Sequence, residues 1–278
     1  MAVLLALLTT MSISAGEFFA AGVTRRTRAH EVTSSMFASG VVLTSVVALL
    51  WPGEPTRTDL LVGALSGVAN GTAVLLLYLA YSRGSLRSAA PAAAVVMSSV
   101  PIVWDVVVTG TSPSFITWIG IILGVSAIAL TTYEGGGGQD EQPILMIAVA
   151  AGVIFGVMLI LLGEVGEDAG GRPIFFQRVV GFLVAAIATR ATGPRIFPGD
   201  KAVRARSFVV GLFATSAVLL FVLALQAGGS LAVVSVIGSQ YAAVAVLLGV
   251  VFGGQSMRWW QGLGLLGTSV AVALITIG

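Results

Sequence analysis

Long apolar stretches alternate with short polar joints along almost the whole chain. Each stretch holds about twenty residues, which in a helix is enough to cross the hydrocarbon core of a bilayer. Because lipid offers no partner to an open backbone group, such stretches must be helical. The pattern predicts an all-α integral membrane protein with ten transmembrane helices, at residues 2–23, 32–50, 60–81, 87–108, 114–133, 144–163, 173–191, 207–226, 230–252 and 258–277.

A low-complexity run, EGGGGQDEQP at 134–143, separates the first five predicted helices from the last five. Its glycines favour flexibility and its acids favour solvent, so we interpret it as a linker. It divides the chain into a first five-helix repeat, 1–133, and a second, 144–278. Similar segments recur in both: RGSL at 83–86 and GGSL at 228–231, then LGVSAIAL at 123–130 and LGTSVAVA at 266–273.

Basic residues favour alternate joints between the predicted helices. The odd-numbered joints hold eleven of the 14 Lys and Arg residues, and the even-numbered joints hold the other three. A repeat with an odd number of helices enters the membrane in the opposite direction in its second copy, so this bias predicts inverted repeats. By the positive-inside rule, the same count places both termini outside the cytoplasm.

Composition narrows the function classes. The chain is 57% hydrophobic and only 9% charged, with a mean hydropathy of +1.02 and a net charge of +2, which argues against a soluble domain and a nucleic-acid partner. It has no cysteine and one histidine, His30, which argues against metal centres and thiol chemistry. No P-loop is present to bind ATP. We therefore expect no cofactor and no enzymatic activity.

Four segments, in this order and spacing, are similar to a known family: SAGEFF at 14–19, LLLYLAYSRGSLRSAAPAAAVV at 75–96, FQRVVGFL at 176–183 and GSLAVVSVIGSQYAAVAVLLGVVFGGQ at 229–255. The chain resembles the EamA-type, ten-helix branch of the drug/metabolite transporter superfamily. The resemblance implies a central cavity between two inverted repeats, alternating access, and outer bracing by the fifth and tenth helices.

Two features depart from that family. Its members often end the fourth and ninth helices with Leu-Gly-Glu, where this chain has Gly110-Thr111 and Gly254-Gln255. The family is also usually drawn with both termini in the cytoplasm, opposite to the charge count. The orientation of the termini stays open at this point.

Glu17 lies inside the otherwise apolar stretch TMSISAGEFFAAGVT and shares a helical face with Thr10, Ser14, Ala21 and Thr24. A charge at a helix centre costs about 2.5–3.5 kcal/mol, so such a group faces protein or a water-filled cavity. We interpret Glu17 as a coupling acid that exchanges a proton for a cationic group. The related four-helix multidrug transporters carry a first-helix glutamate with this role. A structural hydrogen bond or an interfacial position are the alternatives.

Other polar and aromatic residues at membrane depth are candidates for substrate contact. Some, such as Asp105 near its helix end, could instead be solvated boundary groups. Arg178, near the start of the seventh predicted helix, is expected to snorkel to the interface. The predicted substrate-binding and coupling residues are Glu17, Ser14, Asn70, Tyr78, Ser98, Trp104, Asp105, Ser239, Gln240 and Tyr241.

These features predict a secondary active transporter that exports small polar or amphipathic metabolites, such as amino acids or amines, with proton coupling through Glu17. An uncoupled facilitator or channel, and a non-transporting membrane scaffold, are the alternatives; a carboxylate-pair enzyme lacks a companion nucleophile. The expected partners are the lipid bilayer, a small-molecule substrate and, if transport is coupled, protons. We expect a monomer or homodimer, as a multi-pass protein of the bacterial inner membrane.

Overall fold

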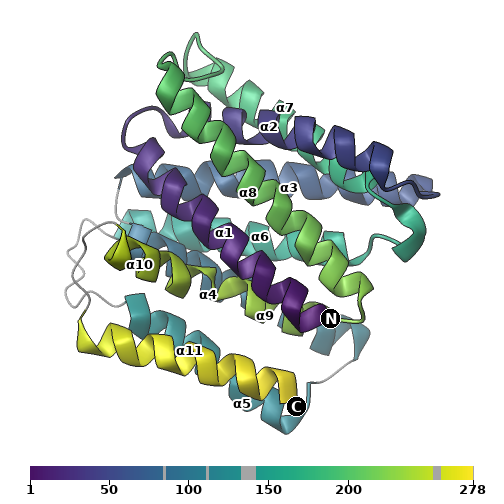
Figure 1. Cartoon of the computed structure of the whole chain (residues 1–278), viewed down its shortest axis with the longest axis vertical. Coiled ribbons are helices and arrows are strands. Elements are labelled where there is room, and N and C mark those ends of the chain that lie inside the picture. The colour runs from purple at the N-terminus through teal and green to yellow at the C-terminus, as the bar shows by residue number, and fades with distance from the viewer. Residues whose placement is uncertain (84–85, 111–112, 133–141, 253–257, 278) are drawn as a thin grey trace.

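The computed structural model describes residues 1–83, 86–110, 113–132, 142–252 and 258–277, which form helices joined by turns and loops, without a strand (Figure 1). The predicted linker over 134–143 lies almost wholly outside these residues. The helices are α1 (Ala2–Thr24), α2 (Ala29–Leu50), α3 (Arg57–Arg83), α4 (Leu86–Trp104), α5 (Phe115–Thr132), α6 (Gln142–Gly163), α7 (Arg172–Thr192), α8 (Lys201–Gln226), α9 (Leu231–Ser239), α10 (Tyr241–Val251) and α11 (Trp259–Ile277).

Seven helical stretches among the described residues are long and apolar enough to cross a membrane. Six correspond to α1, α2, α3, α6, α7 and α8, and the seventh joins α9 to α10 over Leu231–Val251. Shorter apolar helices cover Ala92–Val108, Phe115–Ala127 and Gly262–Ala271. The all-helical, multi-pass membrane class is therefore confirmed, and the count of ten spans and the inverted repeat stay predictions.

The helices form a layered bundle whose two edges differ (Figure 1). At one edge α5 and α11 pack against each other, and α2 and α7 pack together at the opposite edge. Between them, α1 packs on α8, while α3 packs on both α6 and α7. The central helices therefore have protein on several sides, and the edge pairs enclose them.

Glycines let α3 and α7 approach each other closely. Gly63, Gly67 and Gly71 lie four residues apart on one face of α3, and that face meets the α7 backbone. A Cβ on Gly67 would lie 2.5 Å from the Gln177 carbonyl oxygen. Inside lipid the hydrophobic effect does not drive helices together. Small residues at this spacing instead allow the two backbones to pack closely, and this packing stabilises the helix pair.

Two helices depart from the continuous spans predicted over 87–108 and 230–252. The first ends in a π-helical turn, Asp105–Thr109, closed by Gly110 with φ 70°. The second is interrupted at Gln240, whose side-chain Nε2 donates to the Val236 carbonyl at 3.2 Å. A continuous helix would use that carbonyl for the Gln240 backbone N–H, which instead bonds the Ile237 carbonyl at 3.1 Å. The Gln240 side-chain amide thus competes with the Gln240 backbone N–H for the Val236 carbonyl.

A candidate substrate cavity between the two halves

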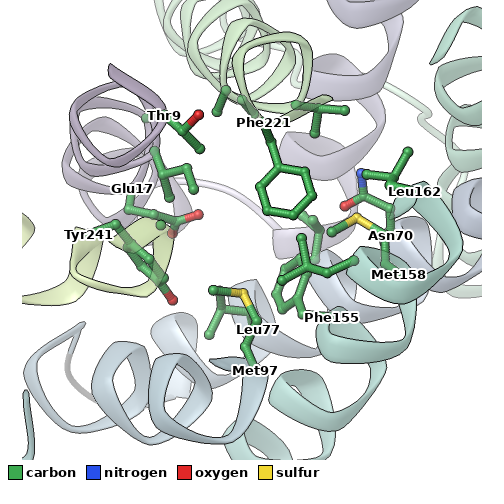
Figure 2. A pocket seen from close by; sticks show the side chains of 18 of the residues that line it. Thr9, Glu17, Asn70, Leu77, Met97, Phe155, Met158, Leu162, Phe221 and Tyr241 are labelled. Atoms are coloured by element: carbon green, nitrogen blue, oxygen red, sulfur yellow. The ribbon is translucent and has the colours of Figure 1, made fainter. Parts of the chain in front are cut away.

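A cavity of about 90 Å³ lies in the middle of the bundle. Both halves of the chain line it: helices α1 to α4 from the first half, and helices α6 to α10 from the second half. Most of the wall is apolar, with Leu77, Phe155, Met158 and Phe221 among its larger side chains (Figure 2). An apolar cavity with a few polar groups is the usual chemistry of a small-molecule site.

Glu17 on α1 points its carboxylate into this cavity, beside Tyr241 of α10 (Figure 2). Its Oε2 is buried and has no hydrogen-bond partner, and no ion pair joins Glu17 to a described cation. The rest of α1 at this level fits tightly on α8, where a Cβ on Gly16 would lie 3.3 Å from the Phe213 Cβ. Glu17 is therefore held in place by its helix, with the Tyr81 side chain close enough to hydrogen-bond to its carboxylate, and its Oε2 is left without a partner.

Two residues of α3 bring further polar groups to the wall. Asn70 is 4% exposed and its side chain makes no hydrogen bond to another described residue, and Figure 2 shows it across the cavity from Glu17. The Tyr78 hydroxyl contacts the Met36 sulfur at 3.4 Å, and its ring stacks on Tyr81 at 5.8 Å between centroids. The Asn70 amide is therefore free to bind a ligand, whereas Tyr78 is held by its neighbours.

Arg178 of α7 also lines the cavity, so the expectation that it snorkels to the interface is wrong. The side chain is 1% exposed, and its Nη2 donates to the Ala214 carbonyl at 2.9 Å. The guanidinium carbon lies 5.5 Å from the centroid of the Phe37 ring, a cation–π contact. The inward path exists because Gly40 has no side chain: a Cβ there would lie 3.0 Å from the Arg178 Cδ.

Three of the predicted serines lie outside the cavity wall. Ser14, Ser98 and Ser239 are each fully buried, and each donates to a carbonyl of its own helix, at 2.6, 3.0 and 2.8 Å. Ser14 also reaches the Tyr241 carbonyl at 3.1 Å, which ties α1 to α10. Their hydroxyls are engaged in helix packing in this structure.

Three more predicted residues also lie outside the wall. Trp104 is the last residue of α4, and Asp105 begins the π turn. The Asp105 Oδ2 accepts from the Ala232 N–H at 3.1 Å, near the N-terminus of α9. An acid there meets the free N–H groups and the positive end of the helix dipole. Gln240 is 5% exposed and sits at the break between α9 and α10.

The structure thus brings Glu17, Asn70, Tyr78 and Tyr241 together from the predicted set. The sequence reasoning missed the apolar wall of α6, since Phe155 and its neighbours belong to a helix that is apolar on every face. It also missed Arg178, although the signal existed: an ionisable group within an apolar segment, the same feature that singled out Glu17.

No family model matches the chain, and no curated protein matches it. Solved structures do match: one, described only as the crystal structure of a protein, superposes with a TM-score of 0.77. The match covers 99% of this chain and 96% of that one at 13% sequence identity. At this identity the likeness shows the fold alone, and it shows that the helical bundle recurs as a complete unit in another protein.

Proposed function

We propose that this chain is a secondary transporter that exports small amphipathic metabolites across the bacterial cytoplasmic membrane. The observation that carries the proposal is the cavity: an apolar space walled by both halves of the chain and containing the carboxylate of Glu17 without a cationic partner. Ionisable groups at membrane depth mark substrate and ion pathways, because their burial is otherwise costly.

The proposal includes ten spans in two inverted five-helix repeats, and the helix packing supports it. If α1 to α5 are exchanged with α6, α7, α8, α9–α10 and α11, each of the most closely packed helix pairs becomes another packed pair or maps onto itself. The α1–α8 pair becomes α6–α3, and α3–α7 becomes α8–α2. The α4–α6 pair becomes the contact of α1 with α9 and α10, and both edge pairs map onto themselves. Two related halves of opposite direction would produce this exchange symmetry.

The size and position of the cavity support alternating access. Ligand sites usually measure roughly 300–1,000 Å³, so a cavity of about 90 Å³ admits a metabolite only after its walls separate. Since the walls belong to both halves, tilting one half against the other opens the space towards one membrane face at a time. Glu17 would then contact the substrate from either membrane face and exchange its proton for the cationic group of the substrate.

Counterflow and gradient-driven accumulation in proteoliposomes test this function. We expect the wild type to exchange labelled amine or amino-acid substrate and to accumulate it against a proton gradient. Glu17→Gln should keep exchange but lose the effect of the gradient, because an amide has no proton to trade. Glu164→Gln, at an exposed acid in the loop after α6, is the matched control. Gradient-driven accumulation that survives in Glu17→Gln would contradict the coupling role.

A further inference from the structure

We infer that Arg178 is the anion-binding residue of the cavity, and that the site selects zwitterions carrying a carboxylate, an ammonium group and an apolar side group. The inference rests on the proposed transport function, because it names the substrate class for the same cavity. It adds a second charged contact, on α7, to the carboxylate of α1.

The guanidinium of Arg178 is a buried cation with unused donors. It is 1% exposed, and its Nε and Nη1 are buried without a hydrogen-bond partner. No ion pair joins it to a described carboxylate. Its one side-chain hydrogen bond runs from Nη2 to the carbonyl of Ala214. A buried charge is normally paired, and a buried donor left unmet is costly. The unmet donors therefore mark a place where an acceptor from outside the chain can bind.

The surroundings hold this side chain in place rather than merely burying it. The Phe37 ring lies against the guanidinium, and the Ala214 carbonyl fixes one terminal nitrogen. Gly40 leaves the space through which the aliphatic stem passes. A planar guanidinium held by one edge presents its other N–H groups as a fork, and that fork matches a carboxylate in a bidentate pair.

The opposite charge stands in the same cavity. Glu17 and Arg178 both line it, yet no ion pair joins them. A simple amine would satisfy Glu17 alone, and a simple acid would satisfy Arg178 alone. A ligand with both charges lets each buried group gain a partner, which makes the zwitterion the best match to the two charges together.

The remaining wall specifies the rest of the ligand. Phe155, Met158 and Phe221 line the same cavity as the two charged groups, and Figure 2 shows these three side chains around it. These side chains offer dispersion contacts and no hydrogen-bond partner, so they favour an aliphatic or aromatic substituent.

Matched ligand series test the inference by calorimetry on the purified protein. One series is leucine, leucinamide and isopentylamine; the other is phenylalanine, phenylalaninamide and phenethylamine. The wild type should bind each zwitterion about 10- to 100-fold more tightly than its amide or amine, the range expected for a charged hydrogen-bonded contact. Arg178→Gln should bring that ratio close to one and change amine binding little. Arg178→Lys should keep part of the preference. Arg172→Gln, an exposed arginine of the same helix, should behave as wild type.

Amine binding shows that Arg178→Gln is folded, so a lost preference in that variant is informative. If that variant does not fold, two other measurements test the inference. One is the wild-type ratio of zwitterion affinity to amine affinity, and the other is the same ratio in Gly40→Ala, which displaces the guanidinium without removing it. A wild-type ratio near one, a ratio unchanged by Arg178→Gln, or failure of both zwitterions to bind overturns the inference. Amine counterflow without any preference for the carboxylate defeats this inference alone. Zwitterion binding without counterflow defeats the transport proposal instead.

Discussion

Several of the buried polar atoms without a partner belong to the cavity wall between the two halves. The buried atoms without a partner include the Glu17 Oε2, the Arg178 Nε and Nη1, and the Ser235 Oγ, all from residues of the cavity wall. Each such atom costs about 1–3 kcal/mol when nothing binds it, and native structures contain few of them. A ligand or water in the cavity would supply the missing bonds at these four atoms.

Gly40 controls how Arg178 enters that space. In Gly40→Ala the new Cβ would lie 2.6 Å from the Thr215 Oγ1 and 3.0 Å from the Arg178 Cδ, so the Thr215 side chain must shift and the Arg178 stem must also give slightly. Because Cδ belongs to a flexible side chain, we expect the guanidinium to shift. The affinity for a zwitterion should fall about tenfold, the loss of one charged hydrogen bond, with little change for an amine. Calorimetry with leucine and isopentylamine measures both.

The double variant Gly40→Ala/Thr215→Ala is the internal control for that experiment. The Thr215 hydroxyl has no hydrogen-bond partner, so removing it should free space at little cost. Affinity for leucine should then recover in part, as coupling between neighbouring sites requires. Equal affinities in the single and double variants would show that Gly40 acts through something other than local space.

At the scale of elements, the contact of α3 with α7 depends on glycine. In Gly67→Ala the Cβ would lie 2.5 Å from the Gln177 carbonyl oxygen. This oxygen belongs to the α7 backbone, so it cannot move without moving the helix. The two helices must separate, at a cost of about 1–3 kcal/mol, as for other overpacked sites. Thermal unfolding in detergent should show a lowered Tm. Gly22→Ala, where no atom lies within 4 Å of the new Cβ, should keep or raise the Tm because alanine favours helix.

The start of α8 is held by Asp200, whose Oδ1 accepts from the Ala202 and Val203 N–H groups at 2.7 and 3.0 Å. These bonds, first of all that from Val203, hold the pKa of the Asp200 carboxyl below its ordinary value. The cap therefore stabilises the fold above the unfolded pKa of about 3.9, and this contribution is lost as pH falls through the lower folded pKa.

Asp200→Ala should lower the Tm at pH 7, and the difference from wild type should shrink below about pH 4, where the wild-type carboxylate is also protonated. Asp200→Asn keeps a capping oxygen and should lie closer to wild type at pH 7. Melting curves between pH 7 and pH 3 check both statements. A difference between wild type and Asp200→Ala that does not vary with pH would mean that the cap does not act through its charge.

The positions of the long helices could be predicted because lipid demands long apolar helices, and a run of twenty apolar residues reveals one directly. Their first residues could not, since α2, α3 and α8 begin at Ala29, Arg57 and Lys201, before the predicted 32, 60 and 207. The break at Gln240 could not, since it depends on a side chain that competes for a single carbonyl. Glu17 stood out because charge is rare inside apolar sequence. The direction of Arg178 depended on Gly40 and Phe37, which adjoin it only in three dimensions.

At the scale of the whole molecule, the two ends of the bundle differ in charge. At one end, the loop after α1 meets the loop after α7, where Arg28 Nη1 donates to the Thr192 carbonyl at 3.1 Å. At the other end, the loops after α2 and α6 meet, with the Glu54 N–H donating to the Asp168 carbonyl at 2.9 Å. Basic residues gather in the first pair of loops: Arg25, Arg26, Arg28, Arg195 and Arg204 line one depression there.

This separation gives a direct test of orientation, because the chain has no cysteine and any introduced thiol is the sole one. Ala191 lies at the basic end and Ala227 at the acidic end, and both are exposed. If the basic end is cytoplasmic, as the positive-inside rule requires, a membrane-impermeant maleimide should label Ala227→Cys on intact cells. Ala191→Cys should react only after lysis. The reverse pattern would place both termini in the cytoplasm, as the family resemblance implies, and would mean that local charge does not set the topology of this chain.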